Sequence, residues 1–278
     1  MKIFTSKSEL SDALKDLKAQ EKQIGLVPTM GALHEGHISL INAARQQTDV
    51  VVCSIFVNPT QFTDPSDLEK YPRTVENDIQ KLEQAGCDIL FLPEVSEMYG
   101  HNETWHLDLG YLESILEGQS RPGHYQGVTQ IVYKLFQLTS PDKAFFGQKD
   151  YQQVLVIRKM TDIFKLPVEL IMCPIQRSEA GLALSSRNVH LSPVEKQQAF
   201  TLSRALLKMK EHAAEADAAA IRQAGLEVLN AEPGIRLDYC EVLDKDTLLA
   251  PDAASTGRVA LIAASVGKTR LIDNMILN

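Results

Sequence analysis

The feature of this sequence that most constrains its fold is a regular alternation of short apolar segments with amphipathic ones between residues 24 and 171. Short apolar runs predict buried strands at residues 24–27, 50–57, 89–92, 144–146 and 168–171. Apolar side chains at helical spacing separate them, around residues 38–44, 75–85, 128–136 and 151–164. Because strands joined by helices form right-handed crossovers, we expect an α/β protein with a doubly wound parallel sheet. Such sheets bind ligands at the carboxyl ends of their strands.

The two ends of the chain differ from this pattern. Ser6 and Glu9 have the spacing of a capping box ahead of a helix that carries Leu10, Leu14 and Leu17. After residue 192 come a long helix, an alanine-rich helix over residues 216–230, and alternating stretches at residues 237–242, 259–266 and 270–277. These segments predict a smaller α+β domain, and we place the domain boundary after residue 178.

Composition excludes several classes of protein. The 278 residues include 28 basic and 36 acidic side chains, and this net charge of −8 argues against a general nucleic-acid surface. The longest apolar stretches, residues 50–57 and 259–266, are shorter than the ~18 residues of a membrane span, and no secretory signal precedes them. We therefore expect a cytoplasmic protein. No CxxC pair occurs, which predicts reduced, buried thiols for Cys53, Cys87, Cys173 and Cys240.

The most informative segment, residues 28–37, has the sequence PTMGALHEGH and joins the first of these apolar strands to a helix. Backbone N–H groups and the helix dipole make such a helix start an anion site. His34 and His37 are three residues apart, so their imidazoles lie on one face of the first turn, and Gly36 leaves room for a ligand. The alternatives are a pair of helix-capping histidines or half of a metal site; the spacing does not fit a HExxH zinc motif.

Three further segments carry polar side chains that suit small ligands. Residues 56–62, FVNPTQF, place two amides, Asn58 and Gln61, after the next strand, although Asn-Pro is also ordinary turn chemistry. Residues 146–153, FGQKDYQQ, combine a glycine for close backbone approach, a lysine suited to phosphate and an aspartate suited to ribose hydroxyls. The uncharged amides of Asn58 and Gln61 suit a hydroxylated or carboxylated small molecule.

The last of these segments, residues 184–188, has the sequence LSSRN. The hydroxyls of Ser185 and Ser186 and the guanidinium of Arg187 form a compact phosphate clamp, and Gly181 suggests a loop that can close. The sequence contains neither a Walker A motif nor GxGxxG, so the commonest nucleotide-binding motifs are excluded.

The four segments, in this order and at these separations, closely resemble the pantoate–β-alanine ligases (pantothenate synthetases) of the HIGH-motif nucleotidyltransferase superfamily. The resemblance covers essentially the whole chain. It implies a Rossmann-like domain, residues 1–178, that binds nucleotide and pantoate, and a smaller α+β lid domain, residues 179–278. It also implies a cytoplasmic homodimer that uses ATP and Mg²⁺ to join (R)-pantoate to β-alanine through a pantoyl adenylate, without nucleic-acid or membrane partners.

The resemblance implies roles for individual residues. His37 would be the proton donor, with His34 beside the phosphates. The catalytic residues would be His37, His34, Lys149 and Arg187. The ATP-binding residues would be Met30, Gly31, Ala32, Leu33, His34, Glu35, Gly36, His37, Gly147, Gln148, Lys149, Asp150, Gln176, Leu184, Ser185, Ser186 and Arg187. The residues that bind pantoate and β-alanine would be Gln61, Gln153 and Asn58, and residues 121–124, RPGH, resemble an Arg-Pro loop near the active site.

Three positions depart from the family pattern. Leu184 replaces the usual methionine, a near-isosteric change that costs little. Ala180 replaces the aspartate before Gly181, so we expect altered loop closure or altered polar contacts there. Gln176 replaces an apolar residue, which is tolerable if only its main chain contacts adenine.

Two alternative functions remain at this point. One is another HIGH-type enzyme, such as a cytidylyltransferase or an aminoacyl-tRNA synthetase; the net charge of −8 and the absence of an evident tRNA-binding segment oppose the synthetase. The other is a nucleotide-binding sensor without turnover, which the intact set of histidines and basic residues opposes.

Overall fold

The computed structural model describes residues 1–101, 103–214 and 217–277, and the chain divides into two compact units. Unit 1 comprises Met1–Gly147 and Gln152–Cys173, and unit 2 comprises Gln148–Tyr151 and the chain from Pro174 onward. The second unit thus begins a few residues before the position that the sequence pattern suggests. Among the described residues, no helix combines the length and the apolar character that a membrane crossing requires.

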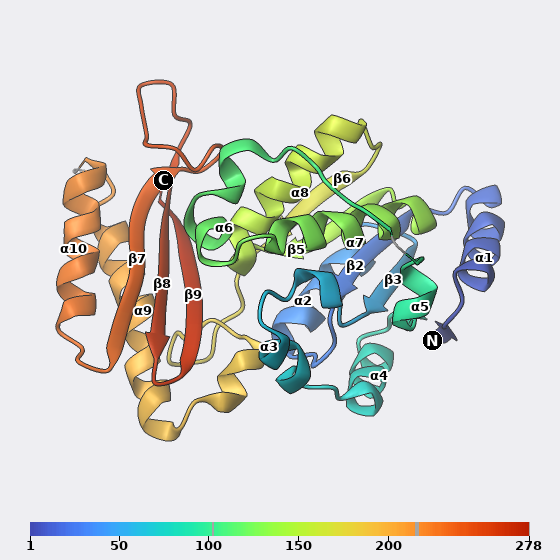
Figure 1. The fold of residues 1–278 in the computed structure, drawn as a ribbon, viewed down its shortest axis with the longest axis horizontal. Coiled ribbons are helices and arrows are strands. Elements are labelled where there is room, and N and C mark those ends of the chain that lie inside the picture. The colour runs from blue at the N-terminus through green and yellow to red at the C-terminus, as the bar shows by residue number, and fades with distance from the viewer. Residues whose placement is uncertain (102, 215–216, 278) are drawn as a thin grey trace. The chain divides into compact units, whose positions relative to one another are not determined.

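Unit 1 is built on a parallel sheet of six strands in the order β1-β4-β3-β2-β5-β6. Strands β2, β3, β5 and β6 are labelled in Figure 1. The strands are β1 (Lys2–Phe4), β2 (Ile24–Thr29), β3 (Val50–Ile55), β4 (Ile89–Phe91), β5 (Lys143–Gly147) and β6 (Glu169–Cys173). The prediction of a Rossmann-like, doubly wound parallel sheet is confirmed. The pattern did not reveal β1, because its three residues are too few to show a period; Ile3 nevertheless pairs with Leu90 of β4.

Helices connect the strands of this sheet. The helices of unit 1 are α1 (Lys7–Ala19), α2 (Glu35–Arg45), η1 (Pro59–Gln61), α3 (Pro65–Lys70), α4 (Val75–Gln84), α5 (Val95–Met98), η2 (Gly110–Glu113), α6 (Leu116–Ser120), α7 (His124–Thr139) and α8 (Tyr151–Phe164). Val27 and Cys53 pack with Leu82 in a core shared with α2 and α4. Leu26 and Val52, which alternation directs to the opposite face, are also fully buried.

One local prediction in unit 1 is wrong. Ser6 occupies the N-cap position of α1, but its side chain makes no capping hydrogen bond, so the capping box with Glu9 does not form. Its hydroxyl lies 2.7 Å from the hydroxyl of Ser8 instead. The spacing of residue types was correct, and a competing local hydroxyl contact replaced the cap.

Unit 2 has the smaller α+β architecture expected from the sequence. Its elements are η3 (Gln148–Asp150), η4 (Ser186–His190), α9 (Pro193–Glu211), α10 (Ala218–Asn230), β7 (Ile235–Asp244), β8 (Arg258–Val266) and β9 (Thr269–Leu277). The strands form an antiparallel sheet in the order β7-β8-β9, and α9 and α10 pack against it (Figure 1). Helix α10 begins at Ala218, capped by Asp217; residue 216, where we expected its start, lies outside the described residues.

All four cysteines are buried and unpaired, as predicted. Burial raises the pKa of the Cys87 thiol to about 11. Burial likewise raises the pKa of the Cys240 thiol to about 12. Both thiols therefore stay protonated near neutral pH, which suits a packing role.

Helix α7 contacts η1 backbone to backbone at Gly127. A Cβ atom added to Gly127 would lie 2.3 Å from the carbonyl oxygen of Thr60. We predict that Gly127→Ala lowers the free energy of unfolding by roughly 1–3 kcal/mol through this clash, even though alanine favours helix by ~1 kcal/mol. Urea unfolding measures the change. Gly100→Ala is the matched control, since its Cβ would meet no atom within 4 Å. Equal stability of the two variants would contradict the close contact.

Candidate functional site

The strand order of unit 1 reverses between β2 and β5. The chain runs from β2 to β3 and β4 on one side, and then returns to place β5 on the other side of β2. In parallel sheets the crevice outside the strand ends at such a reversal is the usual ligand site. Residues 30–37 follow β2, residues 56–62 follow β3, and Gly147 ends β5, so three predicted segments reach this edge. Residues 184–188 belong to unit 2.

His34 and His37 cap the N-terminus of α2. The Nδ1 atom of His34 accepts a hydrogen bond from the backbone N–H of Gly36 at 3.1 Å. The Nδ1 atom of His37 accepts one from the backbone N–H of His34 at 3.3 Å. The ring centroids are 4.1 Å apart, which confirms that both imidazoles lie on one face. Capping and anion binding are compatible here, because the caps orient the rings at the positive end of the helix dipole.

The alternative of half a metal site gains no support. Across residues 1–101, 103–214 and 217–277, no group of three or more His, Cys, Asp or Glu side chains is arranged to hold a metal ion.

The loop that leads into α2 is held by a buried carboxylate that sequence reasoning missed. Gly31 and Ala32 have positive φ angles of 81° and 50°. Asp78 of α4, with none of its surface exposed, accepts hydrogen bonds from Ala32 N at 2.9 Å and Leu33 N at 2.8 Å. Lys81 donates to the carbonyl oxygen of Leu33 at 2.5 Å. The available signal was an aspartate on the same helix face as a buried leucine, one turn before Leu82.

The segments after β2 and β3 meet through Gln61. Its side chain is 8% exposed, and its Nε2 atom lies 3.0 Å from the sulfur of Met30. Asn58 donates from Nδ2 to Oε1 of Gln61 at 3.1 Å and to the carbonyl oxygen of Gly127 at 3.0 Å. The structure thus brings together two segments that the sequence identified separately.

The side chain of Asn58 is fully engaged within unit 1. It is 1% exposed, and its Oδ1 atom accepts from the hydroxyl of Tyr99 at 2.6 Å and from the hydroxyl of Thr60 at 3.0 Å. Burial raises the pKa of Tyr99 to about 12, so the phenol keeps the proton that it donates. Asn58 therefore orients Gln61, and its predicted contact with substrate stays a prediction.

The RPGH segment supports the main chain of Gln61. Nη1 of Arg121 lies 3.1 Å from Nε2 of His124. Since a guanidinium only donates, Nε2 accepts, and Nδ1–H of His124 donates to the carbonyl oxygen of Gln61 at 2.7 Å. This segment, which resembles an Arg-Pro loop, therefore contacts one of the predicted substrate-binding residues directly.

The remaining predicted residues lie on α8 and in unit 2. Gln153 is half-buried on α8, whereas the adjacent Gln152 accepts from Glu117 N at 3.0 Å and so has a structural role. In unit 2, Lys149 Nζ lies 3.9 Å from Oδ1 of Asp150. Ser185 caps η4 by accepting from the backbone N–H of Arg187 at 3.3 Å.

The predicted adenine contact of Gln176 stays a prediction. Gln176 is exposed, and its carbonyl oxygen accepts from Leu184 N at 2.9 Å. A carbonyl oxygen has two lone pairs, so this bond leaves its main chain able to accept another.

The hydrogen bonds that Asp78 accepts from the loop before α2 can be tested by substitution. We predict that Asp78→Asn lowers the free energy of unfolding by about 1–3 kcal/mol, because one acceptor becomes a donor that faces a backbone N–H group. Urea unfolding followed by circular dichroism measures the effect. Glu83→Gln, an exposed acid-to-amide change on the same helix, is the control and should alter stability by less than about 0.5 kcal/mol. Indistinguishable variants would show that the carboxylate does not hold the loop.

Comparison with known proteins identifies the family. Residues 2–276 match the model of the pantoate–β-alanine ligase family. The pantothenate synthetase of Koribacter versatilis is 47% identical over 279 residues, covering 100% of this chain and 96% of the relative. The crystal structure of pantothenate synthetase from Thermus thermophilus is 43% identical, with a TM-score of 0.93 and coverage of 99% of each chain.

A further solved structure carries ligands. The pantoate–β-alanine ligase of Francisella tularensis, complexed with beta-gamma ATP and β-alanine, is 35% identical with a TM-score of 0.82; the match covers 99% of this chain and 97% of that one. These similarities extend over both units and include all four segments found in the sequence. The chain belongs to the pantoate–β-alanine ligase family.

Proposed function

We propose that this chain catalyses the ATP-dependent condensation of (R)-pantoate with β-alanine, giving pantothenate, AMP and pyrophosphate, as a step of pantothenate and coenzyme A biosynthesis. The chain belongs to this family, and the observation that carries the proposal is the contact between two predicted ligand-binding segments at the strand reversal of unit 1. There the amide of Gln61 contacts Met30, at the start of the loop that leads into the histidine-capped helix.

The reaction would proceed in two steps. The carboxylate of pantoate is already ionised near neutral pH, so it attacks the α-phosphorus of ATP without a general base. A bond forms between a carboxylate oxygen and that phosphorus, the bond to the β-phosphate oxygen breaks, and pyrophosphate leaves. The free amine of β-alanine then attacks the acyl carbon of the pantoyl adenylate. The amide forms, AMP leaves, and the amine releases its proton.

The protein's contribution would be positioning and relief of charge. We assign the proton-donor role to His37, with His34 beside the phosphates at the helix N-terminus. Lys149 and Arg187 would neutralise phosphoryl and pyrophosphate charge, assisted by the hydroxyls of Ser185 and Ser186. Gln61 and Gln153 would bind pantoate.

We propose that Mg²⁺ enters with ATP as part of the substrate. Mg²⁺ keeps several waters and binds through substrate phosphates with few protein carboxylates. The described part of the chain contains no cluster of three or more potential metal-ligating side chains.

The resemblance further supports a homodimeric, cytoplasmic enzyme, and light scattering of the purified chain tests the dimer.

The activity itself is tested by AMP formation from ATP, with pantoate or β-alanine omitted in turn. AMP that forms without pantoate, or no AMP with all three substrates, would refute the proposed reaction.

Loss of the imidazole at His37 should slow adenylation. We predict that His37→Ala lowers the rate of pantoate-dependent pyrophosphate release by at least about tenfold, since one charge-stabilising group typically contributes 10²–10³-fold. Circular dichroism serves to verify the fold. Pyrophosphate release at the wild-type rate would exclude the role of His37.

Loss of the amide at Gln61 should affect one substrate selectively. We predict that Gln61→Ala raises the KM for pantoate by about tenfold or more, while the KM for ATP changes by less than about threefold. Initial rates with each substrate varied in turn measure both constants. Equal increases would show that Gln61 does not contact pantoate selectively.

A further inference from the structure

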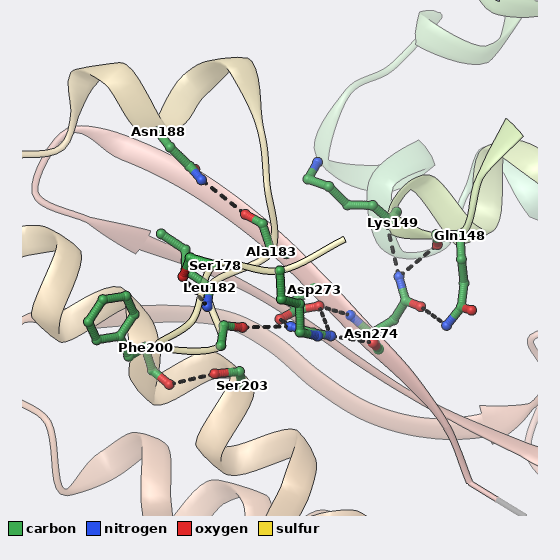
Figure 2. Close-up of polar contacts among 12 residues, drawn as sticks. Gln148, Lys149, Ser178, Leu182, Ala183, Asn188, Phe200, Ser203, Asp273 and Asn274 are labelled. Carbon is green, nitrogen blue, oxygen red and sulfur yellow. Dashed lines mark hydrogen bonds and ion pairs between the residues drawn. The ribbon is translucent and has the colours of Figure 1, made fainter. Parts of the chain in front are cut away.

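Strand β9 holds the backbone of Lys149 through one buried amide. Asn274 is 2% exposed, and its Nδ2 atom donates to the carbonyl oxygens of Gln148 and Lys149, both at 2.9 Å. Its Oδ1 atom accepts from Nε2 of Gln148 at 3.1 Å. Figure 2 shows the amide against the Lys149 backbone, while the Lys149 side chain extends away from it. Asn274 therefore holds the main chain from which this ammonium group extends.

The preceding residue of β9 holds a second segment. Asp273 forms a bidentate pair with Arg177, with Oδ2–Nη1 and Oδ1–Nη2 distances of 2.6 and 2.8 Å. Arg177 also donates to the carbonyl oxygens of Gly181 at 3.1 Å and Asn274 at 3.3 Å. Burial raises the pKa of the Asp273 carboxyl, and the guanidinium opposes that rise. A bidentate pair at a site this buried fixes both orientation and distance.

Residues 176–184 form a closed hairpin that leads into the serine–arginine segment. Ser178 N donates to Leu182 O at 2.9 Å, and Gly181 N, with φ of 93°, donates to Ser178 O at 2.8 Å. Asn188 donates to the carbonyl oxygen of Ala183 at 3.0 Å (Figure 2). The hairpin is thus held by bonds of Ser178 and Arg177, and the expected effect of Ala180 on loop closure stays a prediction.

We propose that Asp273 and Asn274 are positioning residues of the ATP site, and that two consecutive residues of β9 hold Lys149 and the segment carrying Arg187 at a fixed separation. The inference rests on the proposed function, which assigns both cations to the phosphates of ATP. Its physical content is preorganisation: the two charges meet the triphosphate without having to be ordered during the reaction.

The first test compares two substitutions in the same sheet. Asn274→Ala should lower kcat/KM for ATP by about tenfold or more, with the KM values for pantoate and β-alanine changed by less than about threefold. Asp238→Asn is the matched control: Asp238 of β7 pairs with Arg270 of β9 at 2.6 Å. It should leave all three constants within about twofold of wild type, because an ion pair in contact with solvent contributes little.

A double-mutant cycle distinguishes positioning from general weakening of the fold. If Asn274 acts through Lys149, Asn274→Ala should change kcat/KM for ATP by less than about twofold in a Lys149→Ala background. The same cycle pairs Asp273→Asn with Arg187→Ala. Should Asn274→Ala not fold, Asn274→Ser replaces it, because serine keeps a polar group at this buried position while it removes the amide that donates to the two carbonyl oxygens.

The outcomes are distinct. Non-additive effects in the cycles, with the control unchanged, would support the inference. Multiplicative effects, or equal losses for all three substrates, would overturn it while leaving the proposed function intact. A wild-type chain without pantoate-dependent pyrophosphate release would refute the proposed function, and the positioning role with it.

Discussion

The reversal of strand order between β2 and β5 is the constraint on which unit 1 depends. Because all six strands are parallel, every connection must cross a face of the sheet, and each strand delivers its following loop to the same edge. The strands consist largely of buried apolar residues. Polar side chains that could contact a ligand therefore lie in the loops that follow the strands. A helix N-terminus with two imidazoles and a loop with two amides occupy adjacent positions for this reason.

The loops at this edge are ordered by buried polar groups. Asp78 satisfies two backbone N–H groups of the loop before α2, and Asn58 connects Gln61 to Tyr99 and to the backbone of α7. In a low-dielectric interior, such bonds are strong when complete and costly when one partner is missing. Asp273 and Asn274 have the same function in unit 2. The geometry of the candidate residues is therefore set largely by buried side chains to which we assign no catalytic role.

The candidate residues could be predicted from the sequence, whereas most of the buried side chains that position them could not. Strand and helix alternation repeats over many residues, so the parallel sheet and the smaller α+β unit could be predicted. Residues next to strand ends, such as His34 and Gln61, were found because their position relative to the pattern indicates the ligand edge. Asp78, Tyr99 and Asn274 were not, because their partners are distant in sequence: Tyr99 lies 41 residues from Asn58 and Asn274 lies 125 residues from Lys149. The hydroxyl of Ser6 had a correct spacing but a nearer competitor.

The histidine caps of α2 also determine the tautomer of both rings. Each Nδ1 atom accepts from a backbone N–H group, so a neutral imidazole at either position carries its hydrogen on Nε2. A ring that becomes cationic gains a hydrogen at Nδ1 and gives up its cap. The protonation state of these imidazoles is thereby coupled to the first turn of α2. Each ring can keep its cap only while its single hydrogen stays on Nε2, the nitrogen that does not contact the backbone N–H group.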